Sequence, residues 1–548
     1  MPTASTKQSR KRAPGDWGAV SSAPGKRGKG EPPAPALDED FPARVWLYAS
    51  AAILLLAFAL RVYGLDVKPL HHDEGVNGFF LTNLLRQGRY AYDPQNYHGP
   101  TLYYITLPFA ALAGLHTFLI RLVPSLFGVG VVWLVLALRR HVGSVAALAA
   151  ALLVAVSPAC VFYSRYFIHE MLFVFFTLAL VVYALRFRES GATGDLLAAS
   201  ASAALMFATK ETAFISVGTV GLAWVTALVW GRLSGRRGRH ALGAEAEGGF
   251  ARLRREGKLG AAVAGAVALF VFIWVAFYSS FFTNWKGVFW DSFKAFDVWS
   301  KTGMSEFHGK PPDTYVRWLV REDVAVLVLG AVGAAVALFE RRLNRFAVFV
   351  AAWGFGLLAA YSIINYKTPW LVLNFVVPLA VAAGYGVQAF GGWVSGVPSR
   401  ARRAAAAWAL AAAVFGLYQT FVLNFREYDN DQYPYVYSQT LRGFHDLVRE
   451  IERVGERAGT KEPGFATASP EYWPSPWYFR NNSHAGYEGS VSSYYDPKST
   501  LAIIGRVDQL PQLERVTADA YTRVGDTYPL RPGVNLVLFV RKDLAPKQ

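Results

Sequence analysis

Two adjacent carboxylates, Asp73 and Glu74, stand out among the residues of this chain that could carry out chemistry. They directly follow His71 and His72, and His98 lies at the end of the same polar stretch. Strongly apolar runs lie on both sides of it. Carboxylates at the edge of a membrane are costly to desolvate, so such groups commonly mark a reaction site or a transport path. A carboxylate placed there can remove a proton from a hydroxyl group.

Further polar groups occur at the ends of later apolar runs. They are Arg165 and Glu170 in SRYFIHEM, Lys210 and Glu211 in ATKET, and Tyr366, Lys367 and Trp370 in NYKTPW. Acids combined with cations at one membrane depth indicate a site for an anionic lipid headgroup, because cations stabilise a departing phosphate. The alternative is that Lys and Arg at helix ends only extend their charges to the membrane surface. For Arg165 and Lys210 this alternative stays open.

The histidines raise the question of a metal. His71, His72 and His98 could in principle bind zinc, but adjacent histidines rarely converge on one ion. Cys160, the only cysteine, lies in an apolar run, which excludes an intrachain disulfide and a cysteine metal cluster. We predict no metal-ligating residues and no certain cofactor, and we leave a divalent metal open.

The composition is that of an integral membrane protein. Of 548 residues, 53% are hydrophobic and only 17% are charged, whereas about 25% charged residues is typical of soluble domains. The apolar residues form runs of roughly 18 to 22 residues, a length that crosses a bilayer core of about 30 Å. The net charge of +16 could indicate nucleic-acid binding. The basic residues instead cluster in short segments between apolar runs, as expected when they set topology, so we predict no nucleic-acid partner.

The distribution of positive charge predicts the orientation in the membrane. Residues 1–43 are rich in Pro, Gly, Ser, Lys and Arg, which predicts a disordered basic tail on the cytoplasmic side. Inside loops carry dense basic groups such as Arg232 to Lys258, and outside loops carry few. An odd number of spans then places the C-terminus outside a plasma or inner membrane. We expect about eleven spans, near 45–63, 118–138, 144–163, 169–187, 195–209, 212–230, 259–280, 323–339, 346–364, 371–391 and 404–423.

The spans belong to a transmembrane domain over residues 44–425, whose first external loop, 66–116, holds the carboxylate pair. Within this loop, residues 101–116 are apolar but contain Pro108. Counting them as a span would place the basic residues Arg139 and Arg140 outside. We therefore expect an interfacial helix at the outer leaflet.

Residues 426–548 differ in composition and predict a small external α/β domain. Residues 439–458 have the apolar period of an amphipathic helix, and short strand-like runs occur at 464–468, 501–504 and 534–540. Trp473 and Trp477 in this domain either stack on sugar rings at an acceptor entrance or pack the domain core.

The motifs together resemble the membrane glycosyltransferases of the GT-C type, and specifically the protein O-mannosyltransferase and aminoarabinose-transferase-like group (family-39-like). Asp73-Glu74 matches the acidic pair of the first external loop, and Tyr97 to Pro100 resembles the family's His-Pro-Pro stretch. Ser164-Arg165 leads to Glu170, where the family usually has Asp, and Lys210 ends a later span. HDEGVNGF and YKTPW look like a prokaryotic branch that is sometimes described as flippase-associated. The resemblance covers roughly residues 45–425.

The resemblance implies sugar transfer from a polyprenyl-phosphate donor on the external face, with inversion and with Asp73 as general base. It implies a catalytic set of Asp73, Glu74 and Glu170, and a substrate-binding set of His72, His98, Arg165, Lys210, Tyr366 and Lys367. The acid at Glu170 is longer than the family's Asp, which changes the reach of the carboxylate. The acceptor is a glycan, a lipid or a protein. The alternative function is a non-enzymatic, flippase-associated accessory protein in lipid-linked glycan assembly. A transporter would carry polar groups through mid-membrane depth, whereas here they concentrate at one face.

Overall fold

The computed structural model describes residues 41–96, 98–234, 248–304, 309–340, 344–395 and 398–546. The predicted basic tail, residues 1–43, lies outside the described residues except for its last three positions. Tyr97 and residues 235–247 of the predicted inside loop also lie outside them.

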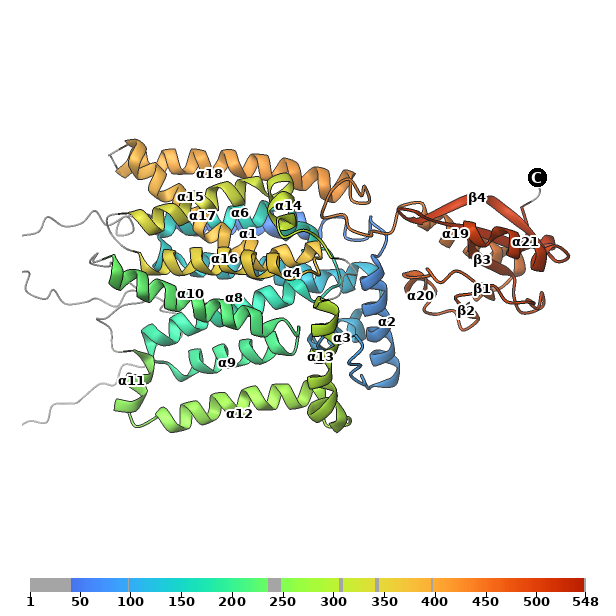
Figure 1. The fold of residues 1–548 in the computed structure, drawn as a ribbon, viewed down its shortest axis with the longest axis horizontal. Helices are drawn as coiled ribbons and strands as arrows, with labels where there is room; N and C mark the ends of the chain where they lie inside the picture. Colours follow the sequence, from blue (N-terminus) through green and yellow to red (C-terminus); the bar gives the residue numbers. More distant parts are fainter. Residues whose placement is uncertain are drawn as a thin grey trace, which may run out of the picture.

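Most of the described chain forms a helical bundle (Figure 1). Eight of the described helices are long and apolar enough to cross a membrane, or up to ten if each of two bent pairs counts as one span. The eight are α1 (Ala43–Val62), α4 (Thr117–Ala137), α8 (Glu170–Ser190), α10 (Ala213–Leu233), α12 (Leu259–Tyr278), α16 (Arg345–Ile363), α17 (Leu373–Ser395) and α18 (Pro398–Phe421).

The bent pairs account for two further predicted spans. They are α6 (Ser144–Val156) with α7 (Pro158–Ser164), at 56°, and α14 (Thr314–Glu322) with α15 (Val324–Phe339), at 110°. The first bend occurs where Pro158 cannot donate a helical hydrogen bond. The remaining predicted span is α9 (Thr193–Phe207), whose 15 residues extend about 22 Å at 1.5 Å per residue. All eleven predicted stretches are therefore helical, and the polytopic α-helical fold is confirmed.

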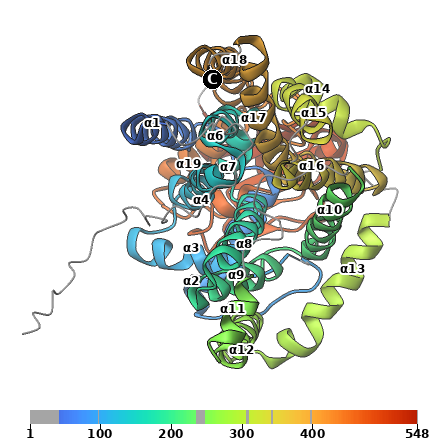
Figure 2. The ribbon, with the colours of Figure 1, turned by 90° about the vertical axis from the view of Figure 1, so that its left-hand side faces the viewer.

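The helix α17 forms the centre of the bundle. In the apolar 18-residue stretch of this span, 94% of the residues are buried, whereas the corresponding shares for α1 and α12 are 11% and 17%. Figure 2 shows α17 beside α6, α15 and α16. Close approach depends on small residues: a Cβ atom at Gly333 would lie 1.8 Å from the carbonyl oxygen of Ala382. A Cβ atom at Gly384 would lie 2.2 Å from that of Ala146.

Two short helices, α2 (His72–Gln87) and α3 (Thr101–Ala113), lie at one end of the bundle, and α2 runs across this end (Figure 1). A capping box begins α2: the His71 side chain accepts from the Asp73 N–H, and Glu74 accepts from the His71 N–H. The helix ends at Gly88, in the left-handed conformation. The 13 residues of α3 extend about 20 Å, too short for a span of about 30 Å. The interfacial placement of 101–116 stays a prediction.

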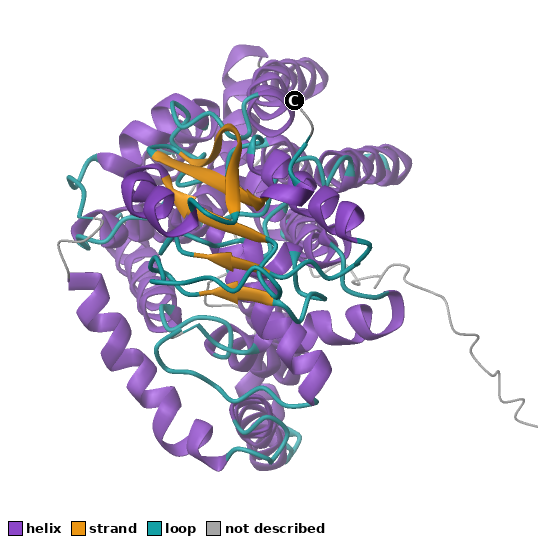
Figure 3. Ribbon diagram, turned by 90° about the vertical axis from the view of Figure 1, so that its right-hand side faces the viewer, coloured by secondary structure: helices purple, strands orange, loops and turns teal. Residues whose placement is uncertain are grey.

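The C-terminal residues form a five-stranded sheet with helices on both faces (Figure 3). The strand order is β2-β1-β3-β5-β4; β1 pairs in parallel with β2 and β3, and β5 pairs antiparallel with β3 and β4. The elements are α19 (Phe444–Ala458), β1 (Phe465–Thr467), α20 (Ser475–Tyr478), β2 (Ala485–Tyr487), β3 (Ala502–Arg506), α21 (Leu510–Thr517), β4 (Tyr521–Arg531) and β5 (Val534–Arg541).

Alternation along β5 fills two separate cores, because successive side chains of a strand point to opposite faces. Leu536 and Leu538 pack with α19, and Val537 and Phe539 pack with Leu513 of α21. The predicted small α/β domain and its three predicted strands are confirmed, whereas the helix predicted over 439–458 begins only at Phe444. The strands β2 and β4 were not predicted from the sequence.

The C-terminal domain packs directly on α2 through two glycines. A Cβ atom at Gly75 would lie 2.7 Å from Cβ of Pro474, and one at Gly78 would lie 2.4 Å from the ring of Trp477. Trp477 is 1% exposed and its indole N–H donates to the Thr117 hydroxyl at 3.2 Å. Trp477 therefore seals the junction between the two domains and is not available to stack on a sugar ring. Trp473 lies beside His72, with ring centroids 6.1 Å apart.

We expect Gly78→Ala to destabilise this junction, because the added methyl group collides with the buried Trp477 ring. Overpacking of this kind typically costs about 1–3 kcal/mol. Gly194→Ala is the matched control, since nothing lies within 4 Å of its new Cβ atom. Thermal unfolding of the purified protein in detergent measures the difference. Equal melting temperatures for the two variants would contradict the tight packing of α20 on α2.

Candidate active site

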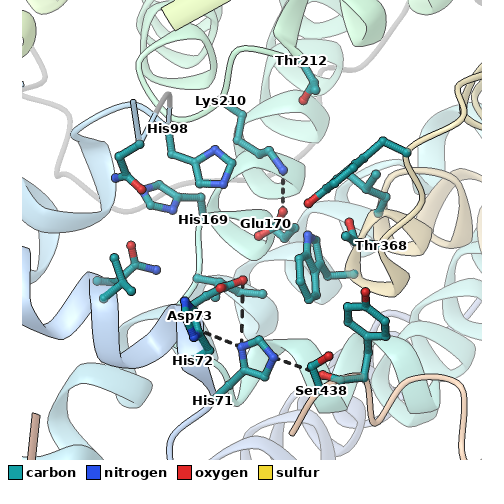
Figure 4. A pocket seen from close by; sticks show the side chains of 18 of the residues that line it. His71, His72, Asp73, His98, His169, Glu170, Lys210, Thr212, Thr368 and Ser438 are labelled. Atoms are coloured by element: carbon teal, nitrogen blue, oxygen red, sulfur yellow. Dashed lines mark hydrogen bonds and ion pairs between the residues drawn. The ribbon is translucent and has the colours of Figure 1, made fainter. Parts of the chain in front are cut away.

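One cavity of about 540 Å³ lies at the α2 end of the bundle, under the C-terminal domain. It gathers residues from segments that are far apart in the sequence (Figure 4). The polar and aromatic lining includes His71, His72, Asp73, Asn77, Asn96, His98, His169, Glu170, Lys210, Glu211, Thr212, Tyr361, Tyr366, Thr368, Trp370, Tyr437, Ser438, Glu471 and Arg531. Six residues that the sequence assigned to a site therefore line one cavity: Asp73, Glu170, His72, His98, Lys210 and Tyr366.

Asp73 offers the accessible carboxylate of the predicted acidic pair. It lies in the first turn of α2 and its side chain is 41% exposed. The neighbouring His71 is buried: its Nδ1 accepts the Asp73 N–H at 3.1 Å, and its Nε2 bonds to the carbonyl oxygen of Tyr437 at 3.0 Å. Burial lowers the pKa of His71, which favours the neutral ring that these two hydrogen bonds require. His71 thus fixes the turn that presents Asp73 to the cavity (Figure 4).

Glu74 lies outside the cavity, fully buried against Arg121 of α4. Arg121 donates Nε to Glu74 Oε1 at 2.7 Å and Nη2 to Oε2 at 2.6 Å. The remaining Arg121 donors bind the carbonyl oxygens of Leu65, Lys68 and Pro69. Burial alone would raise the pKa of Glu74, but Arg121 and Lys68 hold it below its ordinary value. The pair joins α2 and the preceding loop to α4.

A second charged group lies across the cavity. Lys210, in the turn between α9 and α10, is 2.5 Å from Glu170 at the start of α8, and both side chains are almost fully buried. Burial alone would lower the pKa of Lys210, but the two neighbouring carboxylates, Glu170 and Glu211, raise it. Lys210 is therefore a fixed cation, and one of its three donors is used by Glu170.

Two histidines extend this group along the wall. Glu211 accepts from His98 Nδ1 at 3.0 Å, and the rings of His98 and His169 are 4.9 Å apart (Figure 4). His169 Nε2 bonds to the carbonyl oxygen of Gly99 at 3.1 Å, whereas its Nδ1 has no hydrogen-bond partner within the described residues. Burial lowers the pKa of His169 well below its ordinary value. The neutral ring therefore keeps one unused acceptor, which is buried in the wall of the cavity.

Arg165 and Lys367 do not line the cavity, although the sequence assigned both to substrate binding. Arg165 donates to carbonyl oxygens in and just after the last turn of α1, including those of Arg61 and Gly64, and lies over the ring of Phe425. The final carbonyl groups of a helix lack hydrogen-bond donors within the helix, and Arg165 provides these donors at the end of α1. Lys367 is buried, and its ammonium donates to the carbonyl oxygen of Ile364. Both cations are used for local structure.

Several lining residues were not predicted as site residues. Glu211 and Trp370 stood within motifs noted in the sequence, whereas His169 lies between Arg165 and Glu170 and could have been included by proximity. Arg531 and Glu471 come from the C-terminal domain and form an ion pair of 2.6 Å. No sequence signal connects them to α2, because only the packing of the domain brings them there.

The histidines considered for zinc point to different partners. His71 bonds to Tyr437, and His98 bonds to Glu211. In the part of the chain that the structure describes, no group of three or more His, Cys, Asp or Glu side chains is arranged to hold a metal ion.

We expect Glu74→Gln to lower stability strongly, because it leaves the Arg121 charge buried without its partner. Such a loss is worth about 3–5 kcal/mol. The matched variant is Asp73→Asn, whose partly exposed side chain should change stability by about 0.5 kcal/mol or less. Melting temperatures in detergent compare the two. The folded pKa of Glu74 lies below its unfolded value, so the pair stabilises fully above about pH 4.3 and less as pH falls further. Equal stability of both variants would contradict the structural role of Glu74.

Comparisons with known proteins agree with this fold. A family model described as dolichyl-phosphate-mannose-protein mannosyltransferase matches residues 97–243. The structure of ArnT from Cupriavidus metallidurans bound to undecaprenyl phosphate is similar with a TM-score of 0.61 at 12% identity, covering 92% of this chain and 100% of that one. Its apo state gives 0.59 at 12% identity over the same shares. AglB from Archaeoglobus fulgidus, with an inhibitory peptide and a dolichol-phosphate, gives 0.49 at 13% identity, covering 86% and 71%.

No curated protein sequence matches the chain. The matching family model and the ArnT-like fold confirm the resemblance to the GT-C type membrane glycosyltransferases that the motifs indicated.

Proposed function

We propose that the protein transfers a sugar from a polyprenyl-phosphate donor to an acceptor hydroxyl on the external face of the cell membrane, with inversion at the anomeric carbon. The fold is shared with ArnT, which was observed with undecaprenyl phosphate. The family model that matches residues 97–243 is that of a mannosyltransferase whose donor is a lipid-phosphate sugar. Both findings support a lipid-linked donor for this chain.

A single observation carries the proposal: one cavity holds an accessible carboxylate and a fixed cation from different parts of the bundle. Asp73 enters it from α2, and Lys210 enters it from the α9–α10 turn. A general base and a positive charge within one cavity are what a displacement at a sugar phosphate requires. Two helices that are long and apolar enough to cross a membrane, α8 and α16, contribute Glu170 and Tyr361 to the cavity wall, which suits a donor with a prenyl chain.

The reaction follows from these two groups. Asp73 accepts the proton of the acceptor hydroxyl while the acceptor oxygen forms a bond to the anomeric carbon. The bond between that carbon and the phosphate oxygen breaks, and its electron pair leaves with the polyprenyl phosphate. Attack opposite to the leaving group inverts the anomeric configuration. The free donors of Lys210 stabilise the negative charge that develops on the phosphate.

Neighbouring residues position these groups. Glu170 holds the Lys210 ammonium, so its proposed role is positioning, and Glu211 orients His98. His72, His98 and Tyr366 line the cavity and are proposed to contact the substrate. Glu74, which the sequence assigned to catalysis, is proposed to act only through the position of α2, because Arg121 occupies both of its oxygens.

Asp73→Asn tests the proposal directly. Asparagine keeps the size of the side chain but cannot accept the proton, so we expect transfer to fall by roughly 10² to 10⁴ with donor binding retained. The assay follows radiolabelled sugar leaving a polyprenyl-phosphate donor, with purified protein in nanodiscs. Asp66→Asn is the control, since Asp66 is an exposed residue of the loop before α2 and does not line the cavity.

A well-folded Asp73→Asn protein that transfers sugar at the wild-type rate would refute Asp73 as the base. If the wild-type protein transfers nothing from any such donor, the accessory role in lipid-linked glycan assembly replaces the enzymatic one.

The proposed orientation places the cytoplasm at the end of the bundle that carries Ser234, which follows α10. The C-terminal domain lies at the opposite end, beside α2 (Figure 1). In a Cys160-free background, we expect a cysteine at Ser234 to resist a membrane-impermeant thiol reagent in sealed cells and a cysteine at exposed Asp526 to react. Labelling in the reverse pattern would invert the proposed topology.

A further inference from the structure

A second cavity adjoins the proposed active site. It has a volume of about 310 Å³ and shares Tyr437, Ser438 and Arg531 with the larger cavity. Its other walls are Trp318 of α14, the segment 431–436 that leads into the C-terminal domain, and Pro532. A volume of this size lies at the lower end of the range for small-molecule sites, so the cavity suits one compact group that is connected to a substrate in the larger cavity.

The wall between the two cavities is held firmly. Tyr435 is buried, and its hydroxyl donates to Asp323 at 2.9 Å, while its carbonyl oxygen accepts from Tyr163 at 3.0 Å. The carbonyl oxygen of Tyr437 bonds to His71, the residue that also fixes the turn of Asp73. Ser438 follows with φ of +49°, a left-handed conformation that is uncommon for serine. Two hydrogen bonds thus connect this wall to the proposed base.

The residues around the second cavity combine aromatic faces with charges of both signs. Trp318 and Tyr433 are half-buried and line the cavity, with Trp318 against Tyr315 and Arg321 over the Tyr433 ring. Asp431 is exposed and adds a carboxylate. Arg531 adds a guanidinium whose orientation is fixed by Glu471 at 2.6 Å. A pyranose ring is complementary to these residues. Its C–H face packs on an aromatic ring, and its hydroxyl groups form hydrogen bonds with carboxylate and guanidinium groups.

We infer that the second cavity is an acceptor subsite for a glycan, which binds the sugar ring next to the one whose hydroxyl is deprotonated at Asp73. This inference rests on the proposed function and specifies its acceptor. In Figure 4, Ser438, which lines both cavities, and Lys210 lie in different directions from Asp73. Donor and acceptor would therefore approach Asp73 from different directions. A glycan is favoured over a peptide or a lipid because one sugar ring uses the aromatic face, the carboxylate and the guanidinium together.

The experiment compares acceptors of one and two rings. The probes are methyl glycosides of glucose, mannose and galactose, and the methyl glycosides of their 1,4-linked disaccharides, supplied with polyprenyl-phosphate sugar donors. We expect the best disaccharide to have a KM about tenfold lower than its monosaccharide, which corresponds to about 1.4 kcal/mol. Asp431→Ala should reduce the ratio of the monosaccharide KM to the disaccharide KM toward one, and Trp318→Ala should do the same. Asp526→Ala, an exposed residue that lines neither cavity, should keep the wild-type ratio.

Binding without donor separates this inference from the proposed function. Calorimetric titration with the same disaccharide should give about tenfold tighter binding to the wild-type and Asp526→Ala proteins than to Asp431→Ala. If this binding occurs but no donor supports transfer, the subsite stands and the proposed reaction fails. If transfer occurs but neither the KM ratio nor the disaccharide affinity changes in the Asp431 and Trp318 variants, the subsite is wrong and the reaction stands. A serine- or threonine-containing peptide whose use depends on Asp431 would also overturn the glycan assignment.

Discussion

The ion pair between Glu74 and Arg121 is the interaction on which the rest of the site depends. Both side chains are fully buried, and Arg121 places all of its remaining donors on carbonyl oxygens of the loop before α2. Desolvating two charges is costly, and a buried pair is stable only when every donor and acceptor is used, as is the case here. The pair fixes the start of α2 against α4, and the neighbouring Asp73 is thereby held at the cavity while remaining partly exposed.

The position of α2 also explains why the cavity has walls from two domains. One side of α2 packs on the bundle, and its glycines receive Pro474 and Trp477 of the C-terminal domain. This contact brings Glu471 and Arg531 to the rim of the cavity. The bundle supplies the charged groups proposed for the lipid phosphate, and the C-terminal domain together with Trp318 of α14 supplies the wall proposed for the acceptor. The two proposed substrate sites thus meet near α2.

The apolar run lengths predicted the helices of the bundle because a bilayer fixes how long such a run must be, and Asp73 was identified as a candidate because its polar surroundings interrupt that pattern. Individual roles were harder to predict. Glu74 pairs with a residue 47 positions away, and Arg165 donates to carbonyl groups at the end of α1. Neither role is visible in the local sequence. The strand β4 was missed because only two of its eleven residues are buried, which removes the alternation of a half-buried strand. The contribution of Arg531 depends wholly on domain packing.

A structure of the protein with bound undecaprenyl phosphate in nanodiscs tests the central claim most directly, because it locates the leaving group relative to the proposed base. The account predicts that the phosphate lies within hydrogen-bonding distance of the Lys210 ammonium, that the prenyl chain passes between apolar spans, and that Asp73 faces the position of the transferred sugar. A phosphate bound away from this cavity, with Lys210 paired only to Glu170, would contradict the account.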